Sequence, residues 1–110
     1  MERECAEGDW KLFRKKLVGW QDAYIDKLNK EYLQLLGGEG SPAKKFWELE
    51  KRIRADRRKA GVIVEMKRSL LVSSLVELVR EGVITLDDLS EFSEGLQEAV
   101  RWPFEVERGL

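Results

Sequence analysis

Apolar residues recur at spacings of three and four from Trp10 to Leu35, and this pattern constrains the fold more than any other feature. The run comprises Trp10, Phe13, Leu17, Trp20, Tyr24, Leu28, Tyr32 and Leu35. Because an α-helix completes a turn in about 3.6 residues, this spacing places all of these side chains on one face. The pattern predicts a helix over residues 10–36, about 40 Å long, with Asp9 as its N-cap and Gly37 at its end.

A second helix is predicted over residues 41–59. Ser41 followed by Pro42 is typical of a helix start, because serine caps the free amides and proline loses nothing by lacking its own. Gly61 would end the segment. The stripe expected to face the core is Phe46, Leu49 and Ile53.

A third helix is predicted over residues 64–80, and it has the broadest apolar face in the chain. That face comprises Met66, Leu70, Leu71, Leu75, Leu78 and Val79. The segment Val62-Ile63-Val64 is ambiguous, because three β-branched residues in a row also favour a short extended piece. We prefer a helix that begins near Val64.

A fourth helix is predicted over residues 86–101. Thr85 is its expected N-cap, and Asp88 stands three residues later, where a capping box usually has Glu. Leu86, Leu89, Phe92, Leu96 and Val100 are expected to face the core. Pro103 should prevent the helix from continuing, because proline lacks the N–H that the helix needs.

These elements define an all-α chain, a compact bundle of about four helices. A length of 110 residues fits one domain. Short loops should make successive helices antiparallel neighbours. We expect flexible tails at residues 1–8 and 102–110, and the second tail contains Trp102 and Phe104, which could fold back onto the bundle.

The residue types that carry most enzyme chemistry are missing. The chain has no histidine and a single cysteine, Cys5, which excludes His-based catalytic triads and the ordinary zinc sites. Nucleotide-binding and EF-hand motifs are absent. Asp87 and Asp88 are explained by the favourable charge at a helix start, without a metal. Catalysis by lysine or carboxylate groups is conceivable, but no pattern indicates it. We therefore expect no enzyme activity, no cofactor and no metal.

The same features indicate where the protein works. A lone cysteine allows no intramolecular disulfide, which suits a reducing cytoplasm. No apolar run approaches the length of a membrane span, and the acidic start does not look like a secretory signal. A cytoplasmic location without membrane contact is expected.

Charge is distributed unevenly along the chain, although the net charge is only −1. Residues 44–68 carry ten Lys or Arg against four Asp or Glu, whereas residues 69–110 carry three against nine. On a helical wheel the second helix therefore presents a basic strip, away from its apolar stripe. The strip, which is the candidate partner-binding site, comprises Lys44, Trp47, Lys51, Arg54 and Arg58.

This basic strip has several possible interpretations. It could be a solvated helix face, with Trp47 covering the edge of the core and Lys51 stacked on it, or it could lie against the acidic fourth helix of the same molecule. It could also bind an acidic protein surface or a phosphate backbone. Trp20 and Trp47 are the tryptophans that we would examine for exposure, because tryptophan is enriched in binding hot spots.

Several stretches together carry a resemblance that covers most of the chain. They are EC at 4–5, DWKLFR at 9–14, WQDAY at 20–24, LNKEY at 28–32, KFWELEKRI at 45–53 and GVITLDDL at 82–89. In this order they resemble small uncharacterised helical proteins of phages and mobile elements of Gram-positive bacteria. The resemblance implies a protein that occupies a surface of a host defence machine, as anti-CRISPR inhibitors of Cas nucleases do.

We therefore expect a non-enzymatic binding protein. The leading hypothesis is a stoichiometric inhibitor of a protein or nucleoprotein target, such as a CRISPR-Cas nuclease. The alternative is a nucleic-acid-binding accessory or regulatory protein of a mobile element, which would use the basic helix at residues 44–59. A homodimer is a separate expectation, because the long first helix could extend its aromatic stripe beyond the other helices.

Overall fold

The computed structural model describes residues 7–109, and this part of the chain is all-α, with four helices and no strand. The predicted fold class is confirmed. The α-helices are α1 (Glu7–Gly37), α2 (Pro42–Asp56), α3 (Leu71–Arg80) and α4 (Glu94–Glu107). Two short 3-10 helices, η1 (Arg68–Leu70) and η2 (Leu86–Leu89), precede α3 and α4.

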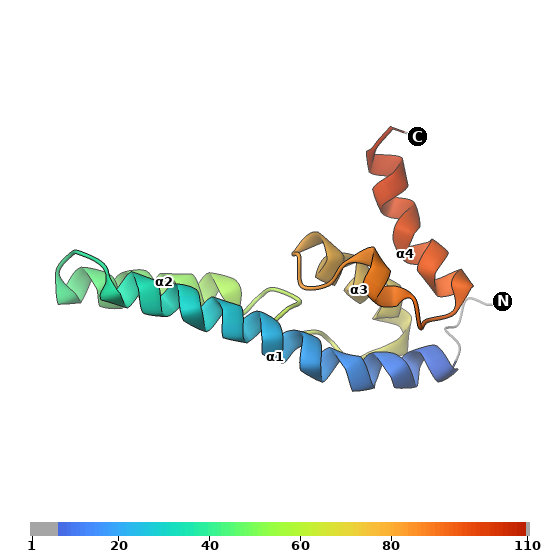
Figure 1. Ribbon diagram of the computed structural model, residues 1–110, viewed down its shortest axis with the longest axis horizontal. Helices are drawn as coiled ribbons and strands as arrows, with labels where there is room; N and C mark the ends of the chain where they lie inside the picture. Colours follow the sequence, from blue (N-terminus) through green and yellow to red (C-terminus); the bar gives the residue numbers. More distant parts are fainter. Residues whose placement is uncertain (1–6, 110) are drawn as a thin grey trace.

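The helices form an elongated molecule rather than a compact bundle. Helix α1 runs along almost its whole length, α2 folds back on the C-terminal half of α1, and α3 and α4 gather at the N-terminal half (Figure 1). The molecule measures 57 × 33 × 20 Å, and its radius of gyration is 17.0 Å. A compact chain of this length would have a radius of about 13 Å. The expected compact shape is therefore wrong, because α2 and the α3–α4 pair cover different halves of α1.

The hydrophobic core lies at the N-terminal half of α1. Its residues come from α1, α3, the turn before η2, η2, the segment between η2 and α4, and α4: Trp10, Phe13, Leu17, Leu71, Leu75, Val76, Leu78, Ile84, Leu89, Phe92, Leu96 and Val100. The apolar side chains that recur along the N-terminal half of α1 thus pack in this core. Tyr24 and Leu28, in its central part, are also buried. Most of the aromatic stripe of α1 is therefore covered by other parts of the chain, and a homodimer through this stripe stays a prediction.

Asp9 connects the starts of two helices instead of capping its own. The residue lies inside α1, which begins at Glu7, and it is buried. Its carboxylate accepts hydrogen bonds from the backbone N–H of Ser93 (2.9 Å) and from the Ser93 hydroxyl (2.6 Å). Ser93 in turn caps α4, since its Oγ accepts a hydrogen bond from the N–H of Leu96. The predicted N-cap role of Asp9 is wrong, because α1 begins two residues earlier and the Asp9 carboxylate bonds Ser93 at the start of α4 instead.

The third helix begins later than predicted. Residues 63–67 are not helical, and α3 starts only at Leu71, after η1. The N–H groups of Val62 and Ile63 both donate to the carbonyl of Lys59 and close a turn. This tight turn stops the chain from continuing directly into a helix, and Met66, expected in the core, is largely exposed.

The predicted fourth helix is divided in two. The Thr85–Asp88 capping box forms, with the Thr85 N–H donating to the Asp88 carboxylate at 2.8 Å, but it starts η2 rather than α4. Helix α4 starts at Glu94 and continues through Pro103 to Glu107.

The expected helix end before Pro103 is therefore wrong. Tertiary contacts compensate for the missing N–H: Phe104 packs against the core, the Arg80 guanidinium lies 5.2 Å from the centre of its ring, and Arg80 pairs with Glu107. Most of the predicted C-terminal tail is thus helical. At the other end, Glu7 and Gly8 belong to α1, and residues 1–6 of the predicted N-terminal tail lie outside the described residues.

Candidate functional site

The C-terminal half of α1 and helix α2 form an antiparallel pair that projects from the core (Figure 1). We call residues 24–59 the arm. Ser41 starts α2 as predicted, because its Oγ accepts the N–H of Lys44 at 3.2 Å. The Lys45 ammonium donates to the carbonyl of Leu36 at 3.0 Å, across the turn.

Polar contacts join the two helices of the arm. The Tyr32 hydroxyl donates to Oδ2 of Asp56 at 2.6 Å, and the Arg52 guanidinium bonds Oε1 of Glu31 at 2.7 Å. Lys59 approaches the other carboxylate oxygen of Asp56 at 3.3 Å. Asp56 is only 4% exposed, so these partners supply the hydrogen bonds and charge that a buried carboxylate needs.

This environment shifts the pKa values of half-buried Tyr32 and buried Asp56. Burial, together with the hydrogen bond to Asp56, raises the pKa of the Tyr32 phenol to about 12. Burial would also raise the pKa of the Asp56 carboxyl. Hydrogen bonds from Tyr32 and Lys59, with the charges of Lys59 and Arg52, outweigh burial and lower the Asp56 pKa below its ordinary value. The cluster therefore holds Asp56 ionised and Tyr32 neutral, which is what a structural contact between helices requires.

These polar contacts rotate α2 away from the predicted orientation. Phe46 and Ile53, expected to face the core, are 60% and 42% exposed, and only Leu49 of that stripe is half-buried. The side of α2 that bonds α1 instead carries Lys45, Arg52 and Asp56. The prediction of an inward Phe46/Leu49/Ile53 stripe is wrong for Phe46 and Ile53, because hydrogen bonds and the Arg52–Glu31 ion pair, rather than apolar packing, lie between the two helices.

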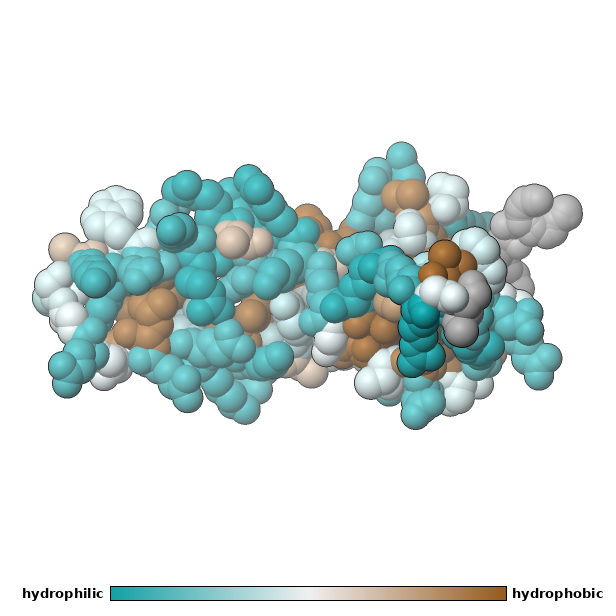
Figure 2. Space-filling view, turned by 90° about the horizontal axis from the view of Figure 1, so that it is seen from above, coloured by the Kyte–Doolittle hydropathy of each residue, from teal (hydrophilic) through white to brown (hydrophobic). Residues whose placement is uncertain are grey.

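The residues of the predicted basic strip all lie exposed on α2 and the turn after it. They are Lys44, Trp47, Lys51, Arg54 and Arg58. Helix positions advance by about 100° each, which places this strip roughly opposite the side that bonds α1. Seen from above, the arm is covered largely by hydrophilic side chains, with apolar patches between them (Figure 2).

Two structural interpretations of the strip are wrong: that Trp47 covers the edge of the core, and that the strip lies against α4. Trp47 is 63% exposed and stacks edge-on against Phe46, with 4.9 Å between ring centres, so it does not cover the core. Within residues 7–109, the ion pairs made by α2 run to α1, to α2 itself or to Lys59, and none reaches α4. Arg54 pairs with Glu50 one turn earlier. The strip is therefore a surface of the arm.

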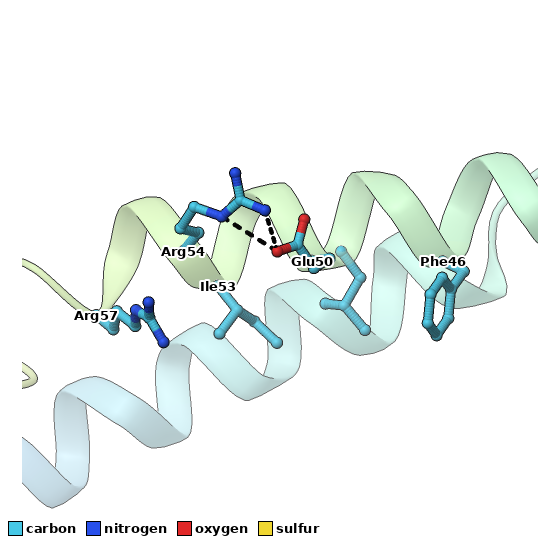
Figure 3. A pocket seen from close by; sticks show the side chains of 6 residues that line it. Phe46, Glu50, Ile53, Arg54 and Arg57 are labelled. Atoms are coloured by element: carbon cyan, nitrogen blue, oxygen red, sulfur yellow. Dashed lines mark hydrogen bonds and ion pairs between the residues drawn. The ribbon is translucent and has the colours of Figure 1, made fainter.

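An open apolar hollow of about 300 Å³ lies beside the strip on α2. Its lining comprises Phe46, Leu49, Glu50, Ile53, Arg54 and Arg57. Figure 3 shows Phe46 and Ile53 pointing to the same side of the helix, with Arg57 at the end next to Ile53 and the Glu50–Arg54 pair above them. The sequence did not indicate this hollow, because its apolar residues were assigned to the core.

The other tryptophans differ from expectation in their exposure: Trp20 was a candidate for exposure, and Trp102 was expected in a tail that could fold back onto the bundle. Trp20 is half-buried, and its ring lies 6.4 Å from that of Phe92 in the core. Trp102 is instead 63% exposed on the outer side of α4. The helical continuation past Pro103, which sequence reasoning missed, is what presents it there.

Comparisons add no relative. No protein-family model, no curated protein and no solved structure matches the chain. None of the helices in residues 7–109 combines the length and the apolar composition that a membrane span needs.

Proposed function

We propose that the chain is a non-enzymatic binding protein, and that it docks the outer face of α2 on a negatively charged partner. The observation that carries the proposal is the exposed basic strip on an arm that projects from the core. Positive charge steers encounter with an acidic surface, and an exposed tryptophan within it provides the contact area typical of a hot spot.

The partner proposed is a protein or nucleoprotein complex, which the chain inhibits by occupying one of its surfaces. The resemblance to proteins of phages and mobile elements suggests the class, a guide-loaded Cas nuclease, and the lone cysteine suits action in the cytoplasm. A nucleoprotein presents both acidic side chains and phosphates, which suit lysine and arginine in a row.

The direct experiment mixes the purified chain with guide-loaded Cas nucleases and measures complex formation and DNA cleavage. The expected result is a complex of fixed stoichiometry whose formation stops cleavage. Full cleavage at a large excess of the chain, with no complex on a sizing column, would refute the inhibitor proposal.

A second candidate function is nucleic-acid binding by the arm alone. The observation that favours it is Trp47, which is exposed between Lys44 and Lys51 of the basic strip, where a base could stack on its ring. Binding to a single-stranded oligonucleotide should then weaken steeply as salt increases, because phosphate contacts release counterions. Absent or salt-independent binding would exclude this candidate.

A further inference from the structure

Helix α4 presents an acidic and apolar face to solvent at the opposite end of the molecule from the arm (Figure 1). Trp102 is 63% exposed and Val106 46% exposed. Glu98 lies one turn before Trp102 and Glu105 about one turn after it, so both are on the same side of the helix. Helix α4 carries four glutamates and one arginine, a net charge of −3.

The hollow on the arm has the complementary character. Phe46 and Ile53 give it an exposed apolar floor, while Arg54 and Arg57 lie one turn apart along its edge. Residues 42–59 carry eight Lys or Arg against three Asp or Glu, a net charge of +5. Two arms placed face to face would therefore repel each other, whereas the arm and α4 attract.

We propose that the hollow on the arm binds the outer face of α4 from a second copy of this chain. Trp102 of one copy lies against Phe46 and Ile53 of the other. The glutamates on either side of Trp102 approach the arginines at the edge of the hollow. The two surfaces cannot meet within one molecule, because α4 packs on α3 at the far end of α1.

This contact is of the head-to-tail kind, since it joins two different surfaces. It differs from the homodimer expected through the aromatic stripe of α1, whose residues are largely covered within the chain. The hollow shares one residue, Arg54, with the basic strip of the proposed function. Trp47, Lys51 and Arg58 belong to the strip alone, and Phe46, Ile53 and Arg57 line the hollow alone, so each surface can be altered without the other.

Sedimentation of the full chain over a concentration range tests the proposal, from about 10 µM to about 1 mM, where weak association is measurable. The mass of the wild type should rise with concentration, and added salt should weaken this rise. The variants Ile53→Glu and Trp102→Glu should each stay monomeric. The matched control is Ile63→Glu, since Ile63 is an exposed isoleucine outside both surfaces, and it should associate like the wild type.

An equimolar mixture of Ile53→Glu and Trp102→Glu separates head-to-tail contact from other modes. Each mixed pair retains one intact arm and one intact α4 face, so association should return in the mixture, although weaker than in the wild type. Circular dichroism confirms that each variant is folded, and Arg57→Glu and Trp102→Ala serve as milder replacements.

Three results would overturn the proposal: a wild type that stays monomeric throughout, association that survives Trp102→Glu, or a mixture that stays monomeric.

Discussion

Gly61 lies where the chain leaves the arm and passes close to α1. A Cβ atom at this position would lie 2.3 Å from Cδ2 of Tyr24 and 2.7 Å from a methyl group of Val83. Hydrogen bonds also hold the backbone here, because the N–H groups of Ala60 and Gly61 donate to the Glu81 carboxylate, each at 3.1 Å. A side chain at position 61 therefore requires Tyr24 or the backbone to move.

Gly61→Ala should lower the free energy of unfolding by about 1–3 kcal/mol, as overpacking of a close contact does. The control is Gly19→Ala within α1, where an added Cβ meets nothing within 4 Å. That change should raise stability by about 0.5–1 kcal/mol, because alanine favours a helix over glycine. Urea denaturation followed by circular dichroism measures both values, and equal effects of the two variants would contradict the account.

The lowered pKa of Asp56 makes the stability of the arm depend on pH in acid. A carboxyl with a lower pKa in the folded state stabilises the fold above the unfolded pKa, about 4, and this contribution is lost as pH falls through the folded pKa. Asp56→Asn should therefore be less stable than the wild type at neutral pH, and the difference should shrink below about pH 4.

Denaturation of the two proteins between neutral and acid pH measures this difference. Asp26→Asn is the control, because Asp26 forms an exposed ion pair with Lys30 on the same helix and should change stability little. A difference between wild type and Asp56→Asn that stays constant with pH would contradict the role given to the Asp56 carboxylate.

At the scale of helices, periodicity in the sequence predicts which segments are helical better than it predicts their rotation. The spacing from Trp10 to Leu35 identifies α1, and Ser41 marks the start of α2. The rotation of α2 depends on Asp56 meeting Tyr32 across the arm, and a wheel drawn for one helix contains no such partner. For the same reason α4 could not be followed past Pro103.

The sequence likewise predicts one part of the candidate site, the basic strip, but not the hollow beside it. The basic strip follows from the spacing of residues along one helix, and its members are exposed. The hollow next to it depends on Phe46 and Ile53 being left uncovered by α1, which is a tertiary property. Sequence hydrophobicity alone assigns such residues to a core.

Helices α2 and α3 should differ in their local stability. In α2 only Asp56 is buried, whereas α3 buries Leu71, Leu75, Val76 and Leu78. Few buried apolar contacts allow a helix to open locally at lower free energy than the whole molecule. Amide hydrogens of α2 should therefore exchange faster than those of α3 under native conditions, as hydrogen–deuterium exchange can measure. Equal protection of the two helices would show that the arm and the core unfold as one unit.

At the scale of the whole molecule, the division into an arm and a core end also separates the charges. The arm carries most of the basic segment at residues 44–68, and the end formed by α3 and α4 carries most of the acidic segment at residues 69–110. Small-angle X-ray scattering extrapolated to zero concentration should give a radius of gyration near 17.0 Å, the value of the elongated molecule. A value near 13 Å, expected for a compact chain of this length, would contradict the projecting arm.

The central claim is that the outer face of α2 binds a negatively charged partner. The most direct measurement compares three proteins for binding to a guide-loaded Cas nuclease and to a single-stranded oligonucleotide. They are the wild type, Lys51→Glu with Arg58→Glu, and Lys11→Glu with Arg14→Glu. The two double variants change the net charge equally and alter exposed residues, but only the first alters the strip.

We predict that the wild type and the Lys11/Arg14 variant bind one of these partners alike, and that the Lys51/Arg58 variant loses at least tenfold in affinity, which corresponds to about 1.4 kcal/mol. Equal affinity of all three proteins, or no binding of the wild type to either partner, would contradict the claim.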